Sequence, residues 1–347
     1  MSWARKPERG SPFLMRFMVR LTLALGWHVG HALLYPITAY FLLASPASRA
    51  ASRQFLTALG RRPRLADLFW HHFTFSSVLL DRVFLLTGRL RGYDIRVTGL
   101  EHLKPRVDAQ QGCILLGAHI GSFEVLRALA DQGCPVPVKA LMYESNAALI
   151  GQVFHRLNPE RAAAVIPIGG AESVLRIKEA LAAGELVGML GDRIASGDKV
   201  VAVDFLGSSA LLPVGPMVLA SVLKAPVVLF FGIHRGNRRY DIVFEPFAER
   251  VELTPGAKTV DLTAWAQRYA ARVASVARAY PYNWFNFYDF WGGRDGAAVA
   301  DSSSPDRQRR GDGAPLRRGR LTDLVRGGSG RADDGVVASS RSPEQLS

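Results

Sequence analysis

Only two cysteines, Cys113 and Cys134, occur among the 347 residues of this chain. A framework of disulfide bonds is therefore excluded as the source of its stability, and the cytosolic side of a membrane is the expected compartment. Cys113 lies within an apolar stretch, and Cys134 stands beside Pro135. Both are interpreted as small buried side chains.

Clusters of metal-ligand residues are missing as well. His71 and His72 are adjacent, so on a helix their side chains point about 100° apart and cannot bind one metal ion together. Packing in the core or at an interface is the expected role of both. We expect neither a metal ion nor another cofactor.

Acidic residues are in deficit, with 30 Asp and Glu against 43 Lys and Arg, which gives a net charge of +13. Such an excess favours an acidic partner. Nucleic acid is not expected, because the arginines are scattered and no nucleic-acid-binding signature is present. Anionic lipid head groups or an acidic protein fit the charge better, and the hydrophobic content of 48% indicates contact with a membrane.

Formal charge is also missing from Leu21 to Ser48, a stretch longer than the roughly 20 apolar residues that a membrane span needs. Basic residues flank it on both sides, so the positive-inside rule assigns no orientation. The alternatives are a span, a kinked hairpin, an anchor in the membrane plane, and a signal peptide ending near Ala44–Ala47. We favour an uncleaved anchor and interpret residues 1–64 as a membrane-anchoring segment.

Strand and helix signals alternate after Ile95, with short connections between them. This alternation predicts an α/β fold with a mostly parallel mixed sheet flanked by helices, covering residues 65–293. Residues 294–347 are dominated by Gly, Ser, Asp and Arg, which predicts a disordered basic tail. The predicted strands are 95–100, 113–118, 136–143, 163–169, 185–190, 200–207, 226–235 and 240–247. The predicted helices are 64–86, 124–130, a segment ending at Leu157, 171–184, a segment opened by Pro216, and 261–280.

The most informative segment follows the apolar run from Cys113 to Ala118, which is typical of a strand buried on both faces. His119 comes at the carboxyl end of this strand, where ligands bind in open α/β sheets, and Glu124 follows in the next helix. An imidazole held by a carboxylate can remove a proton from an attacking hydroxyl. We therefore predict that His119 is a general base oriented by Glu124. A histidine that only caps the strand end is the alternative.

The sequence His-Ile-Gly-Ser-Phe-Glu at 119–124 resembles the His-x4-acid block of the bacterial lipid A late acyltransferases, within the superfamily of lysophospholipid and glycerolipid acyltransferases. The similarity runs from about Gly10 to Trp291. The aromatic run 281–291 looks most like a divergent branch found in gene clusters for aryl polyenes and pigments. Further matching segments are 142–146, 191–193, 204–207 and 212–216.

The resemblance implies a glycerolipid-acyltransferase-like fold with an N-terminal hydrophobic membrane anchor. It also implies an O-acyltransferase of the cell inner membrane, acting at the cytoplasmic face. The donor would be an acyl thioester, carried by the acidic acyl carrier protein, and the acceptor a hydroxyl of a membrane lipid or glycolipid.

Four further residues are candidates for substrate binding. Asp192 and Arg193 match the second charged block of the family and are expected to help build the acceptor or catalytic cleft; a surface turn is the alternative. Backbone amides near Gly121 and Ser122, at a helix N-terminus, are expected to bind the oxyanion. Ser122 as a covalent nucleophile is disfavoured, because no Gly-x-Ser-x-Gly turn surrounds it.

Some alternatives stay open. Lipid A members usually have an Asp-Gln-Asp type of string where this chain has Gly-Asp-Arg-Ile, so a lysophospholipid or polyene acceptor competes with a lipid A precursor. The aromatic run 281–291 is expected to pack against the sheet, and a wall that binds an acyl chain is the alternative. A non-catalytic membrane scaffold with the same fold would have no need of the pair His119 and Glu124.

Overall fold

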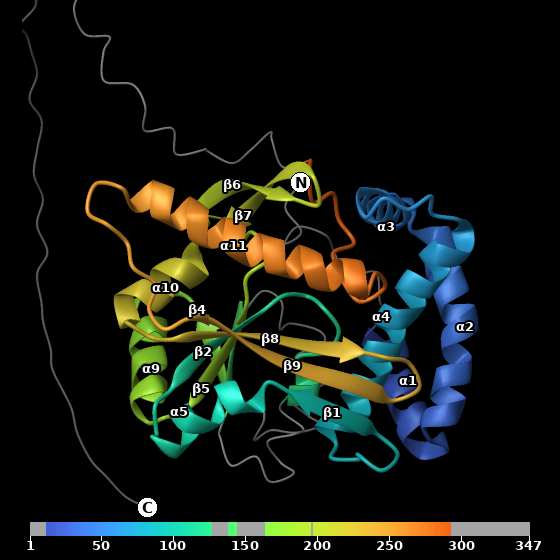
Figure 1. The fold of residues 1–347 in the computed structure, drawn as a ribbon. Helices are drawn as coiled ribbons and strands as arrows, with labels where there is room; N and C mark the ends of the chain where they lie inside the picture. Colours follow the sequence, from blue (N-terminus) through green and yellow to red (C-terminus); the bar gives the residue numbers. More distant parts are fainter. Residues whose placement is uncertain (1–11, 127–137, 144–163, 196, 293–347) are drawn as a thin grey trace, which may run out of the picture. The chain divides into compact units, whose positions relative to one another are not determined.

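The computed structural model describes residues 12–126, 138–143, 164–195 and 197–292. A seven-stranded sheet of order β1-β9-β8-β2-β5-β3-β4 lies at the centre, and β6 and β7 form a separate two-stranded sheet (Figure 1). The strands are β1 (Asp94–Thr98), β2 (Cys113–Gly117), β3 (Val138–Tyr143), β4 (Val165–Ile168), β5 (Leu186–Leu190), β6 (Val200–Phe205), β7 (Ser208–Pro213), β8 (Val227–His234) and β9 (Arg239–Ala248). The helices are α1 (Pro12–Leu25), α2 (Trp27–Ala44), α3 (Pro46–Ala58), α4 (Leu65–Leu86), η2 (Leu100–His102), α5 (Lys104–Asp108), α9 (Gly170–Ala182), α10 (Gly215–Leu223) and α11 (Lys258–Ala279).

All neighbours in the large sheet are parallel except β8 and β9, which form an antiparallel hairpin. This arrangement confirms the predicted α/β class with a mostly parallel mixed sheet. Four predictions fall wholly or partly outside the described residues and are not compared with the structure. They concern the helix 124–130, the helix ending at Leu157, Cys134 and the tail from residue 294.

Strand β2 is buried along its whole length because helices cover both faces of the sheet. Ile114 and Leu116 belong to the core that contains α10 and α11, whereas Cys113 and Leu115 belong to the core that contains Leu85 of α4. Successive side chains of a strand point to opposite faces, so an uninterrupted apolar run is needed at such a position. The prediction of a doubly buried strand is confirmed.

The strand predicted at 200–207 does not join the large sheet. Its counterpart β6 pairs with β7 in an antiparallel hairpin, and the turn contains Leu206 and Gly207 at positive φ. The hairpin packs on α11, with Val203 and Phe205 buried. Strand β7 was not predicted, because its first residues, Ser208 and Ser209, are typical of a turn.

The N-terminal segment forms three helices, α1, α2 and α3, rather than one continuous element. Gly26, at φ 88°, separates α1 from α2, and Ser45 separates α2 from α3. The uncharged stretch from Leu21 to Ser48 is therefore divided among three helices. Within the described residues, no helix combines the length and apolar character required to span a membrane.

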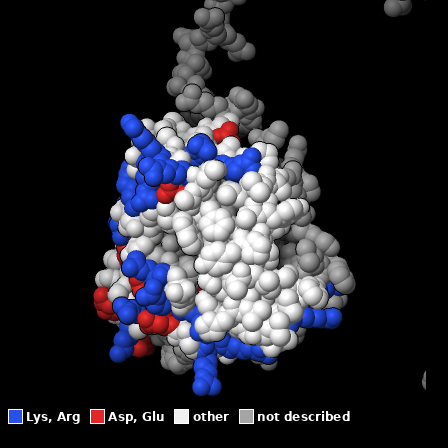
Figure 2. Space-filling model, turned by 90° about the vertical axis from the view of Figure 1, so that its right-hand side faces the viewer, with Lys and Arg blue, Asp and Glu red and all other residues white. Residues whose placement is uncertain are grey.

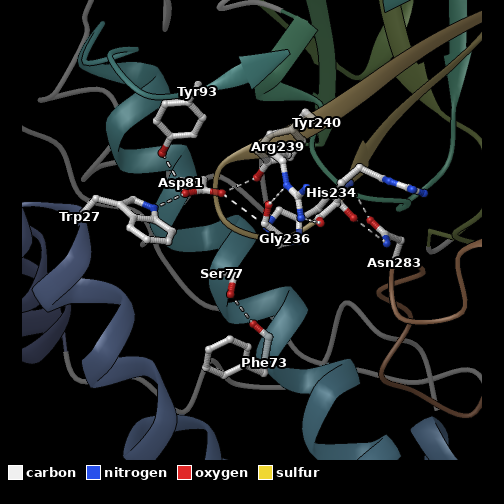
Figure 3. Close-up of polar contacts among 11 residues, drawn as sticks. Trp27, Phe73, Ser77, Asp81, Tyr93, His234, Gly236, Arg239, Tyr240 and Asn283 are labelled. Atoms are coloured by element: carbon white, nitrogen blue, oxygen red, sulfur yellow. Dashed lines mark hydrogen bonds and ion pairs between the residues drawn. The ribbon is translucent and has the colours of Figure 1, made fainter. Parts of the chain in front are cut away.

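A buried carboxylate, that of Asp81, joins α4 to α2 and to the hairpin of β8 and β9 (Figure 3). Burial raises the pKa of Asp81 to about 6, although three hydrogen bonds oppose this shift. The Nε2 atom of His234 lies 3.7 Å from Oδ2 of Asp81. The donors to Asp81 are Trp27 Nε1 at 2.6 Å, Tyr240 OH at 2.7 Å and Tyr93 OH at 2.8 Å.

We expect Asp81→Ala to lower the free energy of unfolding by about 3–5 kcal/mol, because three buried donors would lose their common acceptor. Asp81→Asn keeps an oxygen for Trp27 and Tyr93 and should cost much less. Chemical denaturation monitored by circular dichroism measures both values, with Asp94→Ala on the exposed edge strand as the control. A loss below about 1 kcal/mol for Asp81→Ala would contradict this account of the network.

Candidate active site

His119 lies just beyond the carboxyl end of β2, where the chain bends sharply. Gly121 has φ 62°, and a Cβ atom there would collide with the carbonyl oxygen of Gly232 in β8. Only glycine permits this close approach of the two backbones. The bend leaves the His119 side chain 25% exposed, so its imidazole is partly buried but open on one side.

Asp192 holds the imidazole of His119. It follows β5, which is the parallel neighbour of β2, so the carboxyl ends of the two strands meet at one edge of the sheet. Oδ1 of Asp192 lies 2.7 Å from Nδ1 of His119, and the backbone N–H of His119 donates to Oδ2 at 3.0 Å. Two hydrogen bonds accepted by one carboxylate thus fix both the backbone and the ring of His119.

Two side chains of the aromatic run 281–291 also bind Asp192. Trp284 Nε1 and Asn286 Nδ2 donate to Oδ2 at 3.0 Å and 2.8 Å. Trp284 is fully buried, which confirms the prediction that this run packs against the sheet. The hydrogen bonds to Asp192 were not predicted. The available signal was the placement of asparagines in a run too aromatic for a solvent-exposed loop.

The electrostatic environment favours a neutral imidazole beside an ionised carboxylate. Burial lowers the pKa of His119, and the positive charge of Arg193 lowers it further, against the opposing effect of Asp192. Burial alone would raise the pKa of Asp192, but the hydrogen bonds donated by His119 and the positive charge of Arg193 hold this pKa well below its usual range. The Nδ1 proton is therefore donated to Asp192, and the lone pair of Nε2 is left to accept a proton.

Glu124 does not occupy the position predicted for it. The carboxylate on Nδ1 of His119 belongs to Asp192, whereas Oε1 of Glu124 forms an ion pair with Nη2 of Arg82 on α4, at 2.8 Å. A separation of five residues suggested a direct contact, but the bend at Gly121 intervenes and the next turn carries Glu124 to α4. Asp192 is therefore the orienting carboxylate in this structure.

Arg193 binds the chain segment that contacts Asp192. Its Nε donates to Oδ1 of Asn286 at 2.8 Å, and its Nη2 donates to the carbonyl oxygen of Phe285 at 2.8 Å. The backbone N–H of Phe285 in turn donates to the carbonyl oxygen of His119 at 2.8 Å. Arg193 thus lies beside the pair of His119 and Asp192, and its hydrogen bond to Asn286 keeps that side chain within hydrogen-bonding distance of Asp192.

The amides of Gly121 and Ser122 are already engaged in backbone hydrogen bonds. The N–H of Gly121 donates to the carbonyl oxygen of Asn283 at 2.9 Å, and that of Ser122 donates to Gly232 at 2.7 Å. These two N–H groups therefore have backbone acceptors in this structure, and oxyanion binding by amides near them stays a prediction. The Ser122 side chain is itself buried. The hydrogen bond of Ser122 connects the bend after β2 to β8, and that of Gly121 connects the bend to Asn283.

Comparison with known families identifies the chain. Residues 85–292, more than half of the sequence, match the bacterial lipid A biosynthesis acyltransferases. The protein belongs to this family. No curated protein gives a significant match to the chain. The matched region contains His119, Asp192 and Trp284, whereas Arg82 and the helices before it lie outside.

As a member of the lipid A biosynthesis acyltransferase family, the protein is an enzyme of acyl transfer. Acyl transfer to a hydroxyl needs a base that removes the hydroxyl proton. Nε2 of His119, on a ring held by a buried carboxylate, has the chemistry for this step. No group of three or more His, Cys, Asp or Glu side chains suited to a metal ion occurs in the described part of this acyltransferase.

His71 and His72 of the acyltransferase pack in the interior, as predicted. His71 Nδ1 lies 2.8 Å from Ser52 Oγ, and its Nε2 lies 2.8 Å from the carbonyl oxygen of Trp284. His72 Nε2 lies 2.7 Å from Ser48 Oγ. Burial lowers the pKa of His71 to about 3, so its neutral ring links α3 and α4 to the segment that holds Asp192.

The lowered pKa of His119 predicts the acid limb of the pH–rate profile. The base must be unprotonated, so kcat/KM should fall as pH decreases through the pKa of His119 in the free enzyme. Because burial and Arg193 lower this pKa, the midpoint should lie below the ordinary value of 6.5. Initial rates of acyl transfer in overlapping buffers measure it. A midpoint above 6.5 would contradict the assigned environment of His119.

Proposed function

We propose that the protein transfers a fatty acyl group from an acyl thioester, carried by acyl carrier protein, to a hydroxyl of a lipid or glycolipid. We further propose that this reaction takes place at the cytoplasmic face of the cell inner membrane. The observation that carries the proposal is the pair of His119 and Asp192 at the carboxyl edge of the sheet, in a chain of an acyltransferase family.

His119 acts as the general base in the proposed reaction. Its Nε2 takes the proton of the acceptor hydroxyl while the hydroxyl oxygen attacks the carbonyl carbon of the thioester. The tetrahedral intermediate then collapses, the carbon–sulfur bond breaks, and the imidazolium returns its proton to the leaving thiolate. Asp192 stays ionised throughout, keeps the proton on Nδ1 and stabilises the transient imidazolium.

Glu124 has a supporting role in this scheme instead of the orienting role predicted from the sequence. Its ion pair with Arg82 joins the turn after His119 to α4, and its side chain is buried. Loss of Arg82, whose side chain is partly exposed, would remove an ionic partner from the buried carboxylate of Glu124. The proposed role of Glu124 is to hold the turn that follows His119 at a fixed distance from the N-terminal helices.

Charge supports the two proposed partners. A net charge of +13 favours both an acidic carrier protein and anionic lipid head groups. The family name favours a lipid A precursor as the acceptor. The string Gly-Asp-Arg-Ile at 191–194 differs from the Asp-Gln-Asp type expected of lipid A members, so other lipid acceptors have to be tested as well.

The test is product identification with purified enzyme. Wild type and His119→Ala are each incubated with acyl carrier protein that bears a radiolabelled acyl group, and with a total bacterial lipid extract. We expect a new labelled lipid with wild type alone, and its mass identifies the acceptor as a lipid A precursor, a lysophospholipid or a polyene lipid. If folded wild type binds the carrier protein but makes no labelled lipid, the proposal fails and a scaffold without catalysis is favoured.

A further inference from the structure

Side chains alternate between two environments along the segment that follows α11. Trp284 and Asn286 donate hydrogen bonds to Asp192 in the candidate active site. Phe285 and Phe287 turn the other way and pack on aromatic rings of α4. Every second side chain of this segment therefore faces the candidate site, as in an extended chain.

Tyr288 continues the series that faces the site. Its ring centroid lies 6.0 Å from that of Phe290. Both rings pack against the core that contains α10 and α11, whereas Phe287 packs against the other core. Tyr288 therefore lies on the same side of the segment as Trp284, with a side chain that is only partly buried.

The charged side chains of the site act on the hydroxyl of Tyr288. Burial raises the pKa of this hydroxyl, the negative charge of Asp192 raises it further, and the positive charge of Arg193 opposes the shift. The effect is mutual, since Tyr288 also acts on the pKa of Arg193. The hydroxyl thus lies close to both charged groups and stays protonated at neutral pH, so it can donate a hydrogen bond.

The hydroxyl of Tyr288 makes no hydrogen bond within the part of the chain that the structure describes. Neighbouring side chains already donate to protein acceptors. Trp284 and Asn286 both donate to Asp192, and Arg193 donates to the same segment. The donor of Tyr288 is therefore available to a bound substrate.

Acyl transfer needs such a donor. When the acceptor oxygen attacks the thioester, negative charge develops on the carbonyl oxygen, and donors directed at this oxygen stabilise the transition state. The N–H groups of Gly121 and Ser122 have backbone acceptors in this structure. A tyrosine hydroxyl is one of the groups that serve as donors in such sites.

We propose that the hydroxyl of Tyr288 donates a hydrogen bond to the oxyanion that develops during acyl transfer. The inference rests on the proposed function and deepens it, because it adds a second catalytic residue to the base. Nε2 of His119 takes the proton of the acceptor hydroxyl and returns it to the leaving thiolate. Tyr288 keeps its own proton throughout and stabilises the charge on the carbonyl oxygen between these two steps.

Tyr288→Phe tests the proposal, because it removes the hydroxyl and keeps the ring. We expect kcat for transfer from acyl carrier protein to fall by about 10²- to 10³-fold, the usual effect of removing one oxyanion donor, with KM for the carrier little changed. The temperature of unfolding should stay at the wild-type value, because the hydroxyl has no hydrogen-bond partner in the described part of the protein.

Two variants with the same chemical change serve as controls. Tyr282→Phe lies in the same aromatic run, where the Tyr282 hydroxyl donates to Oδ1 of Asp67 at 2.7 Å. Tyr40→Phe alters a side chain of α2 that is 64% exposed, on the side of the molecule where Figure 2 shows a broad area free of charged side chains. Both controls should transfer acyl groups at the wild-type rate.

A binding measurement tests the same hydroxyl without turnover. A long-chain S-pantetheinyl alkylphosphonothioate has a tetrahedral anionic centre in place of the thioester carbonyl, and a thioether of the same length lacks it. Isothermal titration should show that wild type binds the phosphonothioate about tenfold or more tightly than the thioether. Tyr288→Phe should lose most of this preference.

Three results would overturn the inference. Turnover by folded Tyr288→Phe within about threefold of wild type would remove Tyr288 from catalysis and leave His119 as the base. A lower temperature of unfolding together with the lower rate would show that the hydroxyl has a structural partner. If wild type makes no labelled lipid, the proposed function fails, and equal binding of the phosphonothioate by wild type and Tyr288→Phe then overturns the inference as well.

Discussion

Replacing His119 with alanine is expected to lower kcat/KM for acyl transfer by about 10³-fold, within the range that a general base contributes. The structure holds this imidazole by the buried carboxylate of Asp192 at the carboxyl edge of the sheet. Its removal leaves the acceptor hydroxyl without a base. The fold should survive, because Trp284, Asn286 and the His119 backbone amide still donate to Asp192.

The matched control for this variant is His102→Ala, which removes an exposed histidine from η2. It should transfer acyl groups at the wild-type rate. Circular dichroism and thermal unfolding establish that His119→Ala is folded. Turnover within about fivefold of wild type by folded His119→Ala would remove His119 from the mechanism.

Asp192→Asn is expected to lower kcat/KM by about 10²- to 10⁴-fold through the tautomer of His119. Oδ2 of Asp192 accepts three N–H donors, whereas Oδ1 faces Nδ1 of His119. In the variant, the amide oxygen of the new side chain should therefore take the Oδ2 position, which points its NH2 group at Nδ1. Nδ1 must then accept a hydrogen bond, the proton moves to Nε2, and the base loses its free lone pair.

Two measurements check the Asp192→Asn variant. Steady-state kinetics give the loss in rate, with Asp94→Asn on the exposed edge strand as the control. Nitrogen-15 NMR of the histidine rings reports which nitrogen of His119 bears the proton, a signature that a merely structural role for Asp192 would not produce. An unprotonated Nε2 in the variant, together with a low rate, would contradict the tautomer explanation.

The position of His119 was predictable because the local sequence permits one interpretation. An apolar run without a polar interruption is a doubly buried strand, and the residue after its last apolar position lies at the edge of the sheet. Asp192 likewise comes shortly after a predicted strand, 185–190, and so at the edge of the sheet. The contact between the two residues was not predictable, because it depends on β5 pairing with β2 instead of following the order of the chain.

Glu124 shows that the spacing of two residues in the sequence does not by itself predict that their side chains are in contact. Residues five apart point about 140° apart on a continuous helix, so the spacing alone did not ensure a contact with His119. Gly121 also adopts a positive φ between the two residues. Local pattern contains no information on Arg82, which comes from α4, or on Trp284 and Asn286, which come from the end of the chain's described part. These contacts arise only once the helices are packed on the sheet.

The N-terminal helices also could be predicted only in part from the sequence. The lack of charge from Leu21 to Ser48 predicted an apolar element, but it did not indicate where helices end. Gly26 and Ser45 set those ends, and the packing of α2 on α4 decides which side chains remain outside. The packing of the helices, and not the sequence pattern, therefore decides which apolar side chains of α2 stay exposed.

The most direct test of the central claim is to compare acyl transfer by wild type, His119→Ala and Asp192→Asn under one set of conditions. Labelled acyl carrier protein and a total lipid extract serve as substrates, and the folded state of each protein is verified beforehand. The account predicts a labelled lipid with wild type and a loss of about 10²-fold or more in both variants. Transfer near the wild-type rate by either folded variant would contradict the assignment of His119 and Asp192 as the base and the residue that positions it.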